Sequence, residues 1–86
     1  MPRISAFYGI VIAMYYSDHA PPHFHALYAG SEAQIRIDSL EPLAGALPSR
    51  ALRLVREWAL AHREELELNW ERARNGAPLD TIEPLP

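Results

Sequence analysis

The feature that most constrains the fold is an amphipathic pattern that runs from Pro48 to Arg74 without an internal glycine or proline. Its apolar side chains recur every three or four residues, which is the spacing of one face of an α-helix. They are Ala51, Val55, Trp58, Ala59, Leu66 and Ala73, with His62 and Asn69 on the same stripe. Asn75 and Gly76 follow as a typical helix end. We therefore predict one helix over about residues 48–75, close to ~40 Å long.

The first half of the chain reads as strands. Phe7–Tyr16 is apolar on both faces and rich in β-branched and aromatic residues, which predicts one central strand. A second strand is expected over His23–Ala29 and a third over Glu32–Asp38. The glycine that opens the pair Gly30-Ser31 predicts a type II′ hairpin turn between them.

This turn predicts a register with one core face and one polar face. On the core face Ala26 lies opposite Ile35, and Phe24 lies opposite Ile37. The polar face pairs His25 with Arg36 and His23 with Asp38. A short edge strand is expected around Leu43–Leu47.

The expected fold is a single α+β domain over residues 1–86. A three- to four-stranded, mainly antiparallel sheet (strand-rich region 4–47) packs on one long C-terminal helix, and residues 76–86 form an extended tail. The helix is longer than such a sheet can cover. Either it breaks near His62 or its distal part packs on something else, which leaves a homo-oligomer open.

Composition excludes several classes of function. The chain has no cysteine, so disulfide frameworks, thiolate zinc sites and cysteine nucleophiles are absent. The longest apolar run, Phe7–Tyr16, is half the length of a membrane span, so we expect no membrane partner and a cytoplasmic protein. The net charge of −3 does not favour a nucleic-acid partner, although a local basic patch stays open.

The segment from Asp18 to His25, DHAPPHFH, has the strongest chemical signal. His23 and His25 are two apart on a strand and therefore share a face. With Asp18 or His19 from the preceding loop they would supply three ligands to a divalent metal ion. No cofactor is expected otherwise.

Two other interpretations of this strand face stay open. It is either a solvated polar surface or a site without metal, in which His23, His25, Arg36 and Asp38 bind an anion. The same four side chains would suit a metal-independent ribonuclease, because histidines move protons near neutral pH and an arginine holds a phosphate. Whether the protein is an enzyme is left open.

The predicted helix also carries candidate partner contacts. Arg50, Arg53 and Arg56 lie near its start, where the helix dipole favours acidic residues, and this suggests an anionic partner. Leu60 and Leu68 point away from the buried stripe and suggest a protein partner or a dimer contact.

The motif D-H-A-P-P-H-F-H-A (Asp18–Ala26), the helix run R-A-L-R-L-V-R-E-W-A (Arg50–Ala59) and the closing I-E-P-L (Ile82–Leu85) are similar to a known family. The chain resembles the bacterial domain-of-unknown-function family numbered 4160 over nearly its whole length. The resemblance implies a small cytoplasmic bacterial protein whose gene often neighbours that of a second small protein. The leading hypothesis is therefore a non-enzymatic binding module in a two-gene regulatory or toxin–antitoxin-like system, with the neighbouring gene's product as its partner.

Overall fold

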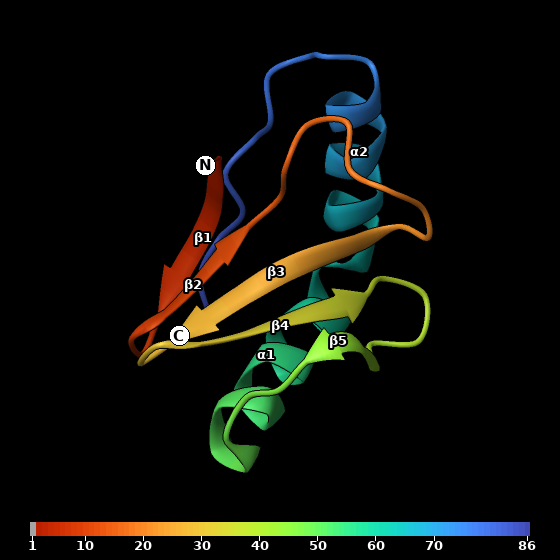
Figure 1. Cartoon of the computed structure of the whole chain (residues 1–86). Helices are drawn as coiled ribbons and strands as arrows, with labels where there is room; N and C mark the ends of the chain where they lie inside the picture. Colours follow the sequence, from red (N-terminus) through yellow and green to blue (C-terminus); the bar gives the residue numbers. More distant parts are fainter. Residues whose placement is uncertain (1) are drawn as a thin grey trace.

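Five antiparallel strands form one sheet, and two helices follow them in the chain (Figure 1). The computed structural model describes residues 2–86. The strands lie in the sheet in chain order: β1 (Arg3–Phe7), β2 (Ile10–Ala13), β3 (His23–Tyr28), β4 (Ser31–Arg36) and β5 (Pro42–Gly45). The α+β class and the antiparallel sheet are confirmed, whereas the predicted number of three to four strands is too low.

The single central strand predicted over Phe7–Tyr16 is wrong, because this run folds back on itself. Tyr8 and Gly9 have φ values of 49° and 80° and form the turn between β1 and β2. Two consecutive left-handed residues are typical of a type I′ hairpin, whose twist matches that of the flanking strands. Tyrosine is an unusual first residue for this turn, so the apolar run conceals it.

The second hairpin turns one residue earlier than predicted, at Ala29-Gly30, with φ values of 48° and 83°. In the observed register Ala26 pairs with Ala33, Phe24 with Ile35, His25 with Gln34 and His23 with Arg36. Each partner on β4 thus moves by two residues from its predicted position. Because side chains on a strand alternate with a period of two, the predicted core face and polar face are both retained.

The long helix is in fact two helices, α1 (Ser49–Ala61) and α2 (Arg63–Arg74). They are separated at His62, whose backbone has φ −125° and ψ 25°. Of the two alternatives for the long helix, the structure shows the break near His62.

The core lies between the sheet and the helices. Trp58 of α1 packs in a tilted arrangement 5.3 Å from Phe7 and edge-on 6.0 Å from Phe24, measured between ring centroids. The largest buried apolar side chains around it are Ile4, Ile10, Ile12, Met14, Ile35, Ile37, Val55 and Leu66. The last residues of the chain return along β1, where the N–H of Ile82 bonds to the carbonyl of Ile4 at 2.7 Å. None of the helices in residues 2–86 is long and apolar enough to cross a membrane.

Candidate metal centre

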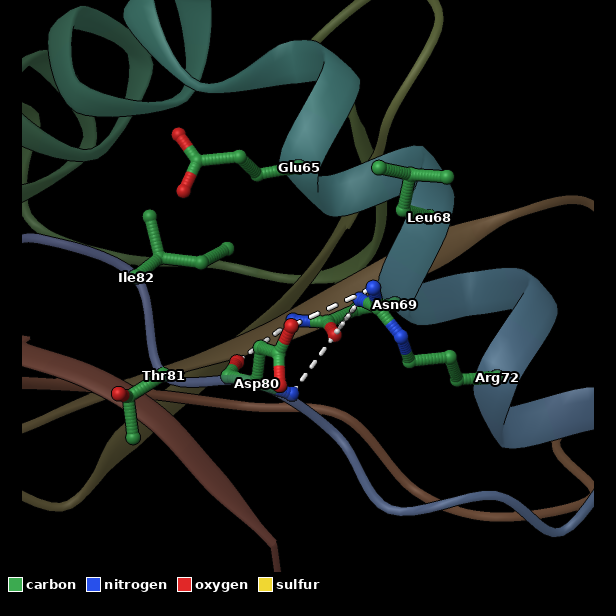
Figure 2. Close-up of a pocket in the computed structure, with 7 residues that line it drawn as sticks. All are labelled: Glu65, Leu68, Asn69, Arg72, Asp80, Thr81 and Ile82. Atoms are coloured by element: carbon green, nitrogen blue, oxygen red, sulfur yellow. Dashed lines mark hydrogen bonds and ion pairs between the residues drawn. The ribbon is translucent and has the colours of Figure 1, made fainter.

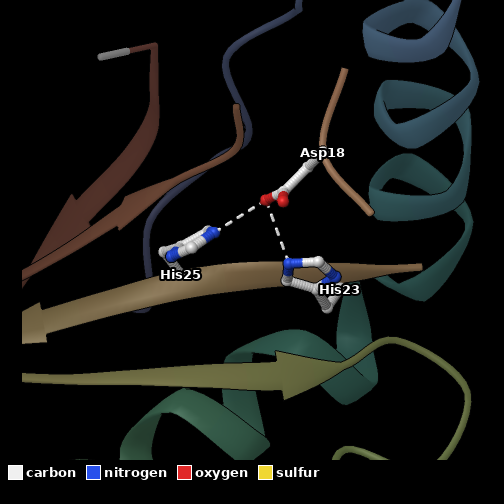
Figure 3. A group of neighbouring side chains, drawn as sticks. All are labelled: Asp18, His23 and His25. Carbon is white, nitrogen blue, oxygen red and sulfur yellow. Dashed lines mark hydrogen bonds and ion pairs between the residues drawn. The ribbon is translucent and has the colours of Figure 1, made fainter. Parts of the chain in front are cut away.

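Three side chains from the predicted motif converge on the polar face of the sheet (Figure 3). His23 and His25 project from β3, and Asp18 reaches them from the loop between β2 and β3. Oδ2 of Asp18 lies 3.0 Å from Nε2 of His23 and 3.0 Å from Nε2 of His25. All three donor atoms lie within 4.8 Å of one another, so they form one cluster.

The loop orients the carboxylate of Asp18. Its Oδ1 accepts a hydrogen bond of 2.9 Å from the backbone N–H of His19, which leaves Oδ2 to face the two imidazoles. Pro21 and Pro22 then lead into β3 without N–H groups of their own. The two prolines thus interrupt strand pairing after β2, and the chain enters β3 within a few residues.

His23 is fixed by the main chain. Its Nδ1 lies 2.7 Å from the carbonyl oxygen of Pro21, which can only accept, so Nδ1 carries the hydrogen. The side chain is 3% exposed, and its Nε2 has no hydrogen-bond partner within the described chain. Trp70 of α2 packs beside the ring, with 5.3 Å between ring centroids. In the neutral ring, Nε2 therefore directs a lone pair at a carboxylate oxygen.

His25 is fixed in the same way by a side chain. Its Nδ1 lies 2.9 Å from Oε2 of Glu32, and a carboxylate accepts the hydrogen there. Tyr15 packs edge-on against the ring at 4.4 Å between centroids. This carboxylate–histidine pair is the arrangement that orients metal-ligating histidines and makes them better donors.

The charge balance keeps Asp18 ionised. Partial burial alone would raise its pKa. The hydrogen bonds from His25 and from the backbone N–H of His19, together with the coulombic attraction of the two imidazoles, outweigh this effect. The pKa of Asp18 is therefore lowered from its ordinary value. With Glu32 beside His25, two carboxylates flank the imidazole pair, which suits a cation rather than an anion.

The other predicted members of the site are placed elsewhere. His19 is exposed in the loop and lies outside the three-residue cluster. Arg36 donates to Asp38 through Nε and Nη2, at 2.9 and 2.8 Å. The predicted pairing of His23 with Asp38 is wrong, because His23 pairs with Arg36 and the Pro21 carbonyl holds its ring.

Glu32 was missed in the sequence. The predicted register places it near the turn, opposite Ala29, whereas the observed pairing of His25 with Gln34 brings it diagonally beside His25. A turn placed at Ala29-Gly30 is the signal that would have found it.

The candidate partner contacts are spread over both helices. Arg56 binds the carbonyl of Leu40 and the carboxylate of Glu41, both at 3.0 Å. Arg50 and Arg53 are exposed on α1. Leu60 and Leu68 are 64% and 55% exposed.

Figure 2 shows a cavity of about 240 Å³ where α2 meets the last residues of the chain. Its lining is Glu65, Leu68, Asn69, Arg72, Asp80, Thr81 and Ile82. These side chains are far in sequence from the histidine cluster, and none of the metal-site residues lines the cavity.

A five-stranded antiparallel sheet, two helices and a His–His–Asp cluster define a small α+β domain with a candidate metal centre on one strand. Residues 9–71 match the family model described as Domain of unknown function (DUF4160), and the chain belongs to that family. No curated protein and no solved structure is significantly similar to it.

Proposed function

We propose that the protein binds a divalent transition-metal ion, zinc in the first place, through Asp18, His23 and His25. The observation that carries this proposal is the buried Nε2 of His23, which lies 3.0 Å from Oδ2 of Asp18 but forms no hydrogen bond with it or with any other described group. Two lone pairs at this distance repel each other, and a buried polar atom without a partner is costly. A cation between them converts both into ligands.

The distances fit such an ion. Ligands bound to tetrahedral zinc at 2.0–2.1 Å are separated by about 3.3 Å. The two Nε2–Oδ2 separations of 3.0 Å need only a small outward movement to reach that value. Both Nδ1 hydrogens are already held by acceptors, so the rings need not rotate. The hydrogen that Nε2 of His25 shares with Asp18 leaves when the ion binds.

The ligand types define the class of metal. Two imidazoles and one carboxylate suit zinc or iron(II), whereas calcium and magnesium prefer oxygen ligands alone. Three protein ligands leave at least one coordination position for water or a small ligand, as in reactive rather than purely structural zinc sites.

The geometry supports this function better than the anion-binding or ribonuclease alternatives. Those need Arg36 beside the histidines, but its guanidinium is engaged by Asp38. The imidazoles face carboxylates instead, and negative charge repels a phosphate.

Metal binding is tested by calorimetric titration and elemental analysis of untagged protein with zinc, iron(II), nickel and manganese. We expect one zinc ion per chain in the wild type. His23→Ala and His25→Ala should abolish this binding. The matched control is His19→Ala, which removes an exposed histidine of the same loop and should bind as the wild type does. Equal affinity in all four proteins, or no binding in any, refutes the proposal.

The two-gene regulatory role remains a separate proposal, and the exposure of Leu60 and Leu68 supports a protein contact there. Co-purification with the neighbouring gene's product should be weakened by Leu60→Glu or Leu68→Glu. Unchanged association in both variants removes the helices as the contact surface.

A further inference from the structure

The last ten residues of the chain, 77–86 (hereafter the tail), lie in extended form against side chains that donate hydrogen bonds to their main chain. Nδ2 of Asn69 donates to the carbonyl of Asp80 at 2.9 Å, and Oδ1 of Asn69 accepts from the N–H of the same residue at 3.0 Å. Nε1 of Trp58 donates to the carbonyl of Glu83 at 2.8 Å. The hydroxyl of Tyr8 donates to the carbonyl of Pro86.

Three side chains from separate elements thus donate hydrogen bonds to one extended segment. Tyr8 lies in the β1–β2 turn, Trp58 in α1 and Asn69 in α2, and the carbonyl of Ile4 in β1 completes the set by accepting from Ile82. We call the surface formed by Ile4, Tyr8, Trp58 and Asn69 the tail groove. Because its bonds reach main-chain atoms, they do not depend on which side chains the bound segment carries.

Asp80 also forms an ion pair with Arg72 at 3.3 Å. The apolar side chains of the tail supply further contacts, and they have a fixed spacing. Ile82 is buried in the core, while Leu79 and Leu85 pack against it. Each lies three positions from the next, which is one turn of a polyproline II helix. Pro78, Pro84 and Pro86 favour the same extended backbone.

Both features are those of domains that recognise proline-rich peptides. In such domains tryptophan, tyrosine and amide side chains donate to exposed carbonyls, and apolar side chains at every third position fill shallow pockets. Trp58 and Asn69 lie within the part of the chain that matches the family model, residues 9–71, and the tail lies outside it. Trp58 is fully buried and Asn69 is too, so each needs an acceptor from whatever segment covers it.

We propose that the tail groove is a peptide-binding site that the chain's own tail occupies, and that it accepts an extended, proline-containing segment of a partner protein. That segment carries apolar side chains at positions i, i+3 and i+6, as Leu79, Ile82 and Leu85 do. The cavity of about 240 Å³ beside Asp80 and Thr81 leaves room for a larger side chain between the first two anchors (Figure 2).

The attached tail competes with any such partner. A segment joined by a short linker has an effective concentration in the millimolar range. The wild-type chain should therefore bind a free peptide only at about millimolar concentration, and weakening the tail should expose the groove to much lower concentrations.

The test uses three synthetic peptides. The first is the tail sequence APLDTIEPLP. The second keeps its three apolar anchors and its prolines and changes all of the remaining residues. The third shifts the middle anchor by one position. Binding is measured by fluorescence anisotropy on the full chain carrying Ile82→Ser and Leu85→Ser, with its fold checked by circular dichroism. We expect the first two peptides to bind at least tenfold more tightly than the third.

A hydrogen-bond variant and its control sharpen the result. In the same background Tyr8→Phe removes one donor and should weaken the first peptide about three- to tenfold. Tyr16→Phe, at an exposed tyrosine that has no bond to the tail, should leave the affinity unchanged.

If the tail variant does not fold, a second experiment uses the wild-type chain. Nuclear magnetic resonance of the isotope-labelled chain should then show the amide signals of Asp80 and Ile82 moving to the positions of a free peptide as millimolar amounts of the unlabelled first peptide displace the tail. A folded variant that binds none of the peptides overturns the proposal. So does equal binding of the shifted peptide, or tail amide signals of the labelled chain that do not move at any peptide concentration.

Discussion

Glu32 and His25 are joined by a 2.9 Å hydrogen bond from Nδ1 of the imidazole to Oε2 of the carboxylate. The bond fixes Nδ1 as a donor to Glu32 and leaves Nε2 directed at Asp18, with which it forms a second hydrogen bond of 3.0 Å. The backbone carbonyl of Pro21 does the same for His23. Both imidazoles are thereby oriented for coordination before any ion arrives, which lowers the cost of assembling a site.

Removing the charge of Glu32 should weaken this orientation without removing a ligand. We predict that Glu32→Gln lowers zinc affinity by about 10- to 100-fold. Calorimetric titration at constant pH measures the change. Glu57→Gln, at an exposed position of α1, is the matched control and should bind as tightly as the wild type. Equal affinities in the two variants would contradict the role assigned to Glu32.

Asp18→Asn should separate stability from metal binding. An asparagine keeps the acceptor that binds the N–H of His19 and replaces Oδ2 by an NH2 group. Its two hydrogens can bond to the orphaned Nε2 of His23 and to Nε2 of neutral His25, which loses its bond to the carboxylate. Without metal, the variant should therefore be more stable by about 1 kcal/mol. A shift of that size raises the melting temperature by about 4–8 °C in a domain of this size.

Excess zinc should reverse that order, because an ion that binds only the folded wild type stabilises it by mass action. Thermal unfolding of both proteins, with a chelator and with zinc, checks the reversal. A variant that is destabilised under both conditions would show that Asp18 serves only as a structural acceptor.

The ion pair of Arg36 and Asp38 predicts a pH dependence of its own. The two hydrogen bonds from the guanidinium lower the pKa of Asp38 from 3.8 to about 2. A folded-state pKa below the unfolded one stabilises the fold above the unfolded value, and this stabilisation is lost as pH falls from about 4 towards 2. Carboxyl carbon resonances followed from pH 6 to pH 1.5 measure the pKa directly. Arg36→Gln should return it towards 3.8, and an unchanged midpoint would show that the pair does not persist in solution.

The α+β fold class and the convergence of His23 and His25 with Asp18 could be predicted from the sequence, because both depend largely on periodicity. His23 and His25 share a face under any register that keeps strand β3, and Phe24 faces the core for the same reason. Asp18 needed only to be near in sequence. The predicted faces are therefore correct even though the predicted strand pairing is wrong by two residues.

The turns could not be predicted in the same way. Tyr8-Gly9 and Ala29-Gly30 both place a residue with a Cβ in the left-handed region, at φ 49° and 48°. Local sequence preference disfavours this, so the pairing of the strands and burial of the core must impose it. Glu32 and the contacts of the tail depend on those turns and on packing between distant residues, which single-sequence patterns do not contain.

Three glycines allow the cost of such backbone positions to be measured. Gly30, Gly45 and Gly76 have φ values of 83°, 73° and 69°. A Cβ at Gly30 or Gly76 would meet no atom within 4 Å, whereas at Gly45 it would lie 2.2 Å from the carbonyl oxygen of Glu32. Gly30→Ala and Gly76→Ala should each cost about 1–2 kcal/mol, since only the left-handed backbone disfavours alanine there.

Gly45→Ala should cost more than either, because the β4–β5 pairing must open to admit the methyl group. Urea unfolding of the three variants gives the free energies of unfolding, and amide exchange locates the loss at β5. If the three substitutions cost the same, backbone conformation alone determines the effect, and the close approach of Gly45 to β4 has no energetic consequence.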